Sequence, residues 1–216
     1  MVKSLILHGK PFIYLDSAAT TQKPGCVIDA MNQFYQTQYG TVHRSVYDFA
    51  SQATDRYNNV RQIVKEFINA AFVEEIIFTK GATEAINLVA STYGEKFIKK
   101  DDEILVTELE HHSNYVPWNF IREKKGAKIT FASVNMKGEV EIDEIKKKIT
   151  NKTKIIAITH LSNVTGAIIP IKKIVDLAKQ KNIPVLVDGT QGAPHLEIDM
   201  QDLGCDFYAI SCHKMY

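Results

Sequence analysis

Cysteine is scarce in this sequence, with three among 216 residues. Cys26, Cys205 and Cys212 are an odd number at unrelated spacings, which argues against a disulfide framework and against a zinc ribbon. Unpaired cysteines are typical of a reducing compartment. We therefore expect a cytoplasmic protein.

Long hydrophobic runs are also missing. No stretch reaches the roughly 18 consecutive apolar residues that a membrane helix needs. The short apolar core around Leu5–Leu7 is too brief for a secretory signal. These absences predict a protein that works without a membrane.

The chain has no excess of either charge, since 26 basic residues face 25 acidic ones and the net charge is +1. This balance gives no electrostatic reason to expect a nucleic-acid partner. The lysine clusters at 99–100, 124–125 and 146–148 are interpreted as solvated faces.

Neither a linker rich in proline, glycine or serine nor an internal repeat is present. With 45% hydrophobic residues the chain has enough apolar material for one well-buried domain, which we place at residues 41–216. Residues 1–40 are predicted to form an N-terminal arm or part of a small subdomain. They contain the turn-rich stretch "DSAATTQKPG" and then a helix that carries Val27, Ala30, Met31 and Phe34.

Segments with strand and helix patterns alternate through the rest of the chain. Apolar residues at three- and four-residue steps predict helices over 57–71, 81–94 and 170–181. Short apolar and β-branched runs predict strands over 75–79, 103–107, 128–134, 153–159, 183–188 and 207–210. Strands that are apolar on both faces, separated by amphipathic helices, predict a three-layer α/β domain around a mostly parallel sheet.

Ligands of such sheets bind at the carboxyl ends of the strands. After the strand predicted to end at Thr79, "KGATEAIN" opens a helix whose first amides are free to bind a phosphate, with Gly81 allowing close approach and the Thr83 hydroxyl as a further donor. In the alternative reading, Thr83 only caps the helix, with Glu84 in its first turn.

Two more strand ends carry unusual side chains. Asp188 ends a strand that is otherwise wholly apolar, where a carboxylate needs a cation or hydrogen bonds, although it could simply cap the next turn. Lys214 follows the last predicted strand, and a desolvated lysine there could form an imine with an aldehyde. The alternative is a surface lysine with a buried stem.

A phosphate-binding helix start, a buried acid and an imine-forming lysine match three groups of pyridoxal phosphate, namely its phosphate, its ring nitrogen and its aldehyde. The sequence therefore predicts a pyridoxal-phosphate enzyme.

A series of motifs follows in order along the chain: "YLDSAATTQKP", "TVHRSVYDFASQAT", "FTKGATEAINLVA", "ELEHHSNYVPW", "ITHLSNVTGAIIPI", "VLVDGTQGAPH" and "CDFYAISCHKMY". In this series the chain resembles the cysteine desulfurases of the class V aminotransferase superfamily, most closely the group that supplies sulfur for iron–sulfur cluster assembly. The resemblance covers nearly the whole chain.

The resemblance implies a role for each matching residue. Lys214 would hold the cofactor as a Schiff base and move the α-proton, and Asp188 would pair with the ring nitrogen. Gln191 would donate to the phenolic oxygen, while His111 would stack on the ring as the second catalytic residue.

The same resemblance assigns the phosphate to Ala82, Thr83, Ser211 and His213. Asn163 would lie near the phenolic oxygen and the substrate carboxylate. The implied fold is the large domain of the fold-type-I pyridoxal-phosphate transferases, here truncated just after the Schiff-base lysine.

Adjacent histidines also raise the question of a metal. His111 and His112 would point apart in an extended chain, and no acid or cysteine stands at a chelating spacing, so no metal is expected. His43 and Arg44 match the family's "VHR" and are expected to order the active-site entrance or a subunit contact.

The implied reaction converts L-cysteine to alanine and leaves a protein-bound persulfide, with a homodimer and a sulfur acceptor or scaffold protein as partners. None of the three cysteines matches the family's nucleophile, and Cys212 is interpreted as a substitution for a small residue. We therefore expect an N-terminal half, from a truncated or split gene or a shortened product, that is inactive alone. A selenocysteine lyase, another class V enzyme and a non-catalytic remnant or interaction domain remain as alternatives.

Overall fold

The structure is a computed structural model that describes residues 6–43 and 45–216. The chain forms two compact units. One consists of the chain up to Ile77 together with His213–Tyr216, and the other is Phe78–Cys212. The division expected near residue 40 stays a prediction.

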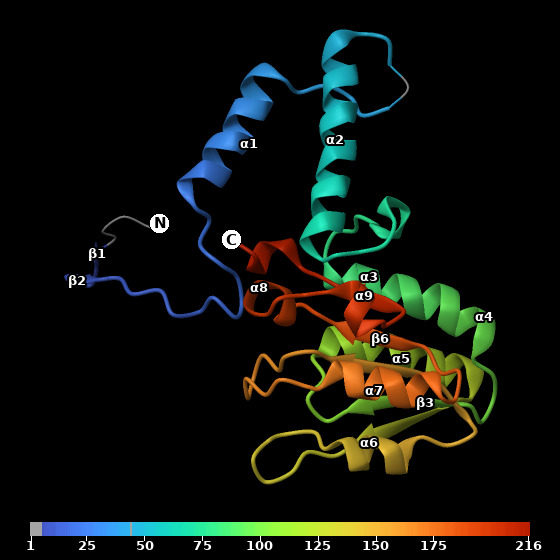
Figure 1. The fold of residues 1–216 in the computed structure, drawn as a ribbon. Helices are drawn as coiled ribbons and strands as arrows, with labels where there is room; N and C mark the ends of the chain where they lie inside the picture. Colours follow the sequence, from blue (N-terminus) through green and yellow to red (C-terminus); the bar gives the residue numbers. More distant parts are fainter. Residues whose placement is uncertain (1–5, 44) are drawn as a thin grey trace. The chain divides into compact units, whose positions relative to one another are not determined.

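The unit Phe78–Cys212 is built on a five-stranded sheet, of which β3 and β6 are labelled in Figure 1. The strand order is β4-β3-β5-β6-β7, and every neighbouring pair is parallel. This confirms the predicted parallel sheet and five of the six predicted strands. The strands are β3 Glu103–Thr107, β4 Lys128–Ala132, β5 Thr153–Thr159, β6 Val185–Asp188 and β7 Phe207–Ala209.

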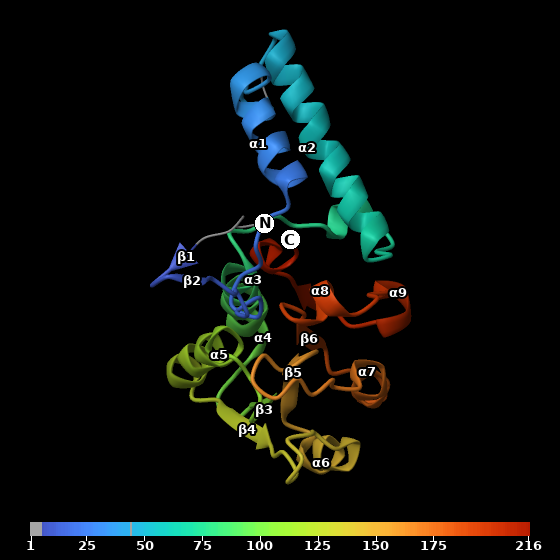
Figure 2. The same cartoon turned by 90° about the vertical axis from the view of Figure 1, so that its left-hand side faces the viewer.

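Helices cover both faces of this sheet, as Figure 2 shows, which confirms the three-layer arrangement. Helices α3 and α5 pack on one face, against Ile104, Val106 and Ala157 of the strands. Helices α6 and α7 pack on the other, against residues that alternate with the first set, such as Leu105 and Ile156. Because successive strand residues point to opposite faces, a strand buried on both sides must be apolar throughout.

The helices of this unit are mostly short. Helix α3 continues through a π-helical segment at Ala90–Gly94 into α4, so the predicted helix 81–94 is confirmed, as is the one over 170–181. The bounds are α3 Ala82–Val89, α4 Glu95–Phe97, α5 His112–Lys125, α6 Ile142–Lys148, α7 Ile171–Lys179, α8 Gly192–His195 and α9 Met200–Leu203.

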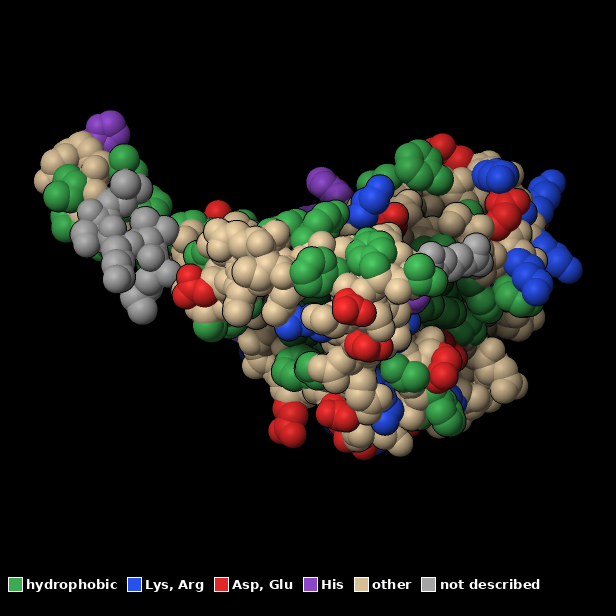
Figure 3. Space-filling view, turned by 90° about the horizontal axis from the view of Figure 1, so that it is seen from above, with side chains coloured by type: hydrophobic (Ala, Val, Ile, Leu, Met, Phe, Trp, Pro, Cys, Tyr) green, Lys and Arg blue, Asp and Glu red, His purple; other side chains and the backbone are tan. Residues whose placement is uncertain are grey.

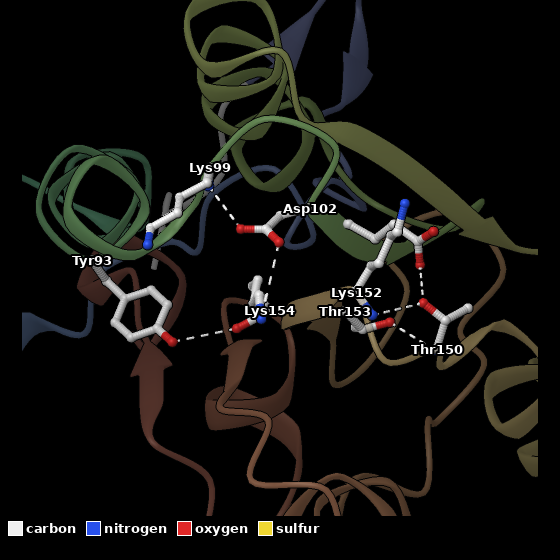
Figure 4. Close-up of polar contacts among 8 residues, drawn as sticks. Tyr93, Lys99, Asp102, Thr150, Lys152, Thr153 and Lys154 are labelled. Atoms are coloured by element: carbon white, nitrogen blue, oxygen red, sulfur yellow. Dashed lines mark hydrogen bonds and ion pairs between the residues drawn. The ribbon is translucent and has the colours of Figure 1, made fainter.

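Polar contacts hold the strands together at their amino ends (Figure 4). The Tyr93 hydroxyl donates to the Lys154 carbonyl at 3.3 Å, and the Lys154 ammonium lies 3.9 Å from the Asp102 carboxylate. The Thr150 hydroxyl donates to the Glu103 carboxylate at 2.6 Å. These contacts join the starts of β3 and β5, at the edge opposite to the one where ligands bind in such sheets.

The strand predicted over 75–79 is wrong. A 3-10 helix occupies Val73–Glu75, and residues 76–79 form no strand. Among the described residues no strand pairs with this segment, and the Ile77 and Phe78 side chains remain exposed. An apolar β-branched run becomes a strand only when a neighbouring strand supplies hydrogen bonds, which the sequence pattern cannot show.

The other unit contains α1 Gly25–Thr37, α2 Asp48–Phe67 and a two-stranded hairpin of β1 Ile6–Leu7 and β2 Lys10–Pro11. Both predicted helices are present, but α2 begins nine residues earlier and ends four earlier than the predicted 57–71. Val60 and Phe67, which share the apolar face of the predicted helix, are about half exposed. Hydrophobic side chains also reach the surface on the face shown in Figure 3.

Within residues 6–43 and 45–216, no helix is both long and apolar enough to cross a membrane.

Candidate active site

The start of α3 lies against the end of β7. The Ala82 amide donates to the buried Ser211 hydroxyl at 3.0 Å, so two residues predicted to hold a phosphate are in direct contact although 129 positions separate them. Gly81 caps the helix with φ at 153°, in a region that favours glycine. Thr83 is therefore not the cap, and its side chain is exposed in the first turn.

Asp188 and Gln191 lie on the turn that follows β6, and both are buried. The Asp188 carboxylate accepts the Thr190 amide at 3.0 Å, so it does cap this turn, as the simpler reading of the sequence held. Its backbone also pairs with Thr159 and Ala209 on the two neighbouring strands. The acid is thus fixed at the carboxyl edge of the sheet, where the predicted contact with a ring nitrogen requires it.

A partly buried pair of side chains supports this turn. The Tyr208 hydroxyl and His160 Nδ1 are 2.8 Å apart, with the two rings nearly perpendicular. Burial raises the pKa of Tyr208 and lowers the pKa of His160, so both groups are neutral at pH 7. A Cβ on Gly189 would overlap the Tyr208 ring, and one on Gly192 would lie 2.8 Å from its hydroxyl. The glycines of "DGTQG" are therefore needed for the tyrosine to fit.

A hollow of about 330 Å³ opens between the loops that follow β3 and β5. One wall is the segment 108–112, which contains His111, and the other is 162–165, which contains Asn163. Two predicted cofactor contacts thus face one cavity at the carboxyl edge of neighbouring strands.

Hydrogen bonds from Ser113 hold the His111 ring. It caps α5, with Nδ1 accepting the Ser113 amide at 3.2 Å and lying 2.8 Å from the Ser113 hydroxyl. A ring nitrogen that accepts an N–H carries no proton, so the neutral tautomer has its proton on Nε2. No group of three potential metal ligands occurs in the described part of the chain.

Sequence reasoning missed Glu110, which lies beside His111. Its carboxyl accepts hydrogen bonds from the Thr107 hydroxyl at 2.6 Å, the Asn114 side-chain amide at 2.6 Å and the Thr159 backbone amide at 3.1 Å. The pKa of Glu110 is raised to about 7, chiefly by burial. The three hydrogen bonds act against this rise, and the charge of Asp188 adds to it. Two glutamates follow β3 at alternate positions, and the sequence alone gives no sign of which one turns inward.

Lys214 and His213 belong to the first unit, where they pack on the segment after β2. The His213 carbonyl accepts the Thr21 amide at 3.1 Å, the Thr20 hydroxyl at 3.1 Å and the Lys23 ammonium at 2.8 Å. Lys214 itself is half-buried, at the end of a 3-10 helix, Cys212–Lys214. That Lys214, Asp188 and Gly81 meet around one ring stays a prediction.

His43 and Arg44 are the residues predicted to order the active-site entrance or a subunit contact. Arg44 lies outside the described residues. The His43 amide donates to the Thr54 hydroxyl at 2.9 Å, and its ring lies against Tyr57 with 5.8 Å between the centroids. A role at an entrance or a subunit contact therefore remains a prediction.

Comparison with known proteins identifies the family. A family model described as aminotransferase class-V matches residues 13–216. The chain belongs to the class-V aminotransferase family. This class-V aminotransferase chain is 47% identical, over 97% of its length, to a probable cysteine desulfurase of Halalkalibacterium halodurans, and covers 52% of that relative.

Solved structures agree with this assignment of the class-V aminotransferase chain. The cysteine desulfurase CsdA of Escherichia coli is similar with a TM-score of 0.84 and 39% identity, over 92% of this chain and 50% of that one. SspA, solved in complex with cysteine, has a TM-score of 0.85 and 26% identity, over 93% of this chain and 57% of the other. The chain spans about half the length of the relatives it matches.

Proposed function

We propose that this chain is the cofactor-binding part of a pyridoxal-phosphate-dependent cysteine desulfurase that takes sulfur from L-cysteine for iron–sulfur cluster assembly. The observation that carries the proposal is the contact between the Ala82 amide and the Ser211 hydroxyl. This contact joins the start of α3, where anions are attracted, to Ser211, which precedes Lys214 by three residues. The identities with cysteine desulfurases support the choice among class-V activities.

The residues present fit pyridoxal phosphate. The Ser211 hydroxyl accepts the Ala82 amide and keeps its own O–H to donate to a phosphate at the start of α3, and the buried Asp188 suits a protonated ring nitrogen. His111 offers an imidazole ring at the hollow. When bound, the cofactor supplies an electron sink for the carbanion formed at the substrate Cα.

The chain's own groups would divide the remaining work. Lys214 would hold the cofactor aldehyde through its amine and carry the proton removed from the substrate. Asp188 would keep the ring nitrogen protonated, and Gln191 would donate to the phenolic oxygen. Asn163, on the wall opposite to His111, would orient the substrate carboxylate.

Cellular location and partners belong to the same proposal. We place the enzyme in the cytoplasm, in keeping with three cysteines that are all unpaired. A homodimer and a sulfur acceptor protein are the expected partners of the whole enzyme.

A labelling experiment tests the proposal. Pyridoxal phosphate added to the chain is expected to give a yellow imine absorbance, and borohydride reduction should fix the pyridoxyl group on Lys214, as identified by peptide mass mapping. Lys214→Ala should abolish both signals. If soluble, folded protein shows no imine, or is labelled equally on surface lysines in both forms, the proposed function is wrong.

A further inference from the structure

The Glu110 carboxyl joins three elements of the sheet unit. Oε1 accepts from the Thr107 hydroxyl, in the last residue of β3, and from the Thr159 amide, in the last residue of β5. Oε2 accepts from Asn114, in the first turn of α5. We call this set of three hydrogen bonds the Glu110 clamp.

The clamp extends the pairing of β3 with β5 beyond the point where their backbones stop pairing. The last paired residues of these strands are Val106 and Ala157. Along β5 the amides face alternate neighbours, and the His160 amide donates to Asp188 on the β6 side. The Thr159 amide therefore faces β3, and Glu110 supplies the acceptor that the β3 backbone does not.

The clamp also reaches the core under α5. Asn114 is fully buried, and its carbonyl oxygen accepts the Trp118 indole N–H at 3.4 Å. Thr107 is 1% exposed, and its hydroxyl accepts the Leu109 amide at 3.1 Å in addition to donating to Glu110. A buried network with every member bonded holds its parts in one arrangement.

The Glu110 clamp joins the ends of β3 and β5, and the two walls of the hollow follow these same two strands. The segment 108–112 begins just after β3, and the segment 162–165 begins just after β5. His111 follows Glu110 directly, and Asn163 lies on the far wall. The same carboxyl that joins the strand ends therefore also lines the cavity between the walls.

The clamp can hold in both protonation states of Glu110. A threonine hydroxyl donates to a carboxylate but can equally accept from a protonated carboxyl. The pKa of Glu110 is raised to about 7 by burial, so both states are populated at neutral pH. The charged group facing it from another strand is Asp188, and Glu108, His111 and His112 share its own loop.

We propose that Glu110 is a positioning residue, whose clamp fixes the two walls of the hollow and so sets the separation of His111 and Asn163 that a flat cofactor ring requires. The part that concerns the ring rests on the proposed function. The part that concerns the walls does not, and it can be tested without cofactor.

The first experiment follows backbone amides by NMR in the cofactor-free chain. In the wild type, the Thr159 amide is expected to titrate with a midpoint near pH 7, and the amides of 162–165 to follow it. Glu110→Gln should remove this step from all of them. Glu123→Gln, an exposed acid on α5, is the matched control and should retain it.

The second experiment measures the affinity for pyridoxal phosphate. In Glu110→Gln the new amide faces the Asn114 amide, donor against donor, so binding should weaken about tenfold. Adding Asn114→Asp supplies an acceptor both to the introduced glutamine amide and to the Trp118 indole, and the double variant should recover most of the affinity. A residue needed only for stability would not be rescued by exchanging donor and acceptor.

The results separate the two proposals. If the wild type binds no pyridoxal phosphate but the 162–165 amides still follow Glu110, the proposed function fails and the wall-fixing role holds. If the chemical shifts of the 162–165 amides change neither with pH nor on Glu110→Gln, the positioning role is wrong. It is equally wrong if Glu110→Gln binds the cofactor as tightly as the wild type.

Discussion

Glu110 makes the stability of the chain depend on pH in a direction unusual for an acid. Because burial raises its pKa from 4.5 to about 7, the folded state binds a proton more tightly than the unfolded state. The contribution of protonated Glu110 to the free energy of unfolding is complete below about pH 4.5 and is lost as the pH rises towards 7. One such group changes the free energy of unfolding by at most about 1.4 kcal/mol per pH unit.

Urea unfolding of the wild type and of Glu110→Gln at several pH values between 4.5 and 8 measures this effect. The difference between the two free energies of unfolding should fall with rising pH and level off above about pH 7. His160, whose pKa is lowered by burial, contributes equally to both proteins and cancels. A difference that does not vary with pH would contradict the assigned environment of Glu110.

Thr21 holds the residue that precedes Lys214. It is buried, its amide and hydroxyl donate to the His213 carbonyl, and its hydroxyl accepts the Tyr216 amide. Thr21→Val keeps the shape but loses the hydroxyl, so we expect Lys214 to react with pyridoxal phosphate about fivefold more slowly. The rate of borohydride-trapped labelling measures this, and Thr37→Val on α1 is the control. Equal rates in all three proteins would show that the contact does not matter.

At the scale of single residues, the sequence revealed positions but not partners. The strand ends at Asp188 and Ser211 could be found because polar residues interrupt apolar runs. Glu110 could not, because Glu108 and Glu110 are both acids in a polar loop. Only the fold shows that Glu108 accepts the Val134 amide while Glu110 turns towards β5.

At the scale of elements, the turn after β6 depends on its two glycines. Gly189→Ala would place a methyl group within the Tyr208 ring, and overpacking of this kind costs about 1–3 kcal/mol or more. We expect a clear fall in the thermal midpoint. Gly25→Ala, at the start of α1 where nothing lies within 4 Å, should leave the midpoint unchanged or raise it slightly.

A second substitution decides whether Tyr208 is the cause. In the background Tyr208→Ala the ring is gone, so Gly189→Ala should add little further destabilisation. Additive losses in the double variant would mean that the glycine is required for another reason.

Strands were easier to predict than their pairing. The inner strands β3, β5 and β6 are recognisable because each is an apolar run that is buried almost throughout, whereas the edge strand β4 is partly exposed. Residues 75–79 have the same composition and are not a strand, because a run of suitable residues still needs a neighbour. The exposed side chains on α2 show the same limit for helices, since periodicity predicts an apolar face but not what covers it.

At the scale of the whole molecule, we expect the 216 residues alone to form neither sulfide nor alanine from L-cysteine. None of the three cysteines matches the nucleophile implied by the family resemblance, and the chain spans about half the length of its relatives. Sulfide and alanine assays with added pyridoxal phosphate measure this. Robust turnover would contradict the expectation and would direct attention to Cys212.

The fold class and the family were predictable because they depend on patterns that run through the whole chain. The position of Asp188 at the end of a buried strand was predictable from its motif, and its role towards a ring nitrogen stays a prediction. The site was not predictable where a contact joins distant segments, as between Tyr208 and His160. Such contacts arise from the order of the strands, which local sequence does not encode.

The uniformly apolar character of β5 has a consequence for folding accuracy. Ile155, Ile156, Ala157 and Ile158 would be buried equally well if the strand slid by one residue, so hydrophobicity scarcely opposes misalignment. The shapes of the packed side chains and the polar groups at the two ends of β5 must then distinguish one alignment from another. The contacts of Thr150 and Lys154 at one end of β5 and of Glu110 at the other therefore help to fix its register. Removing the contacts at both ends together should produce misaligned, aggregation-prone sheets.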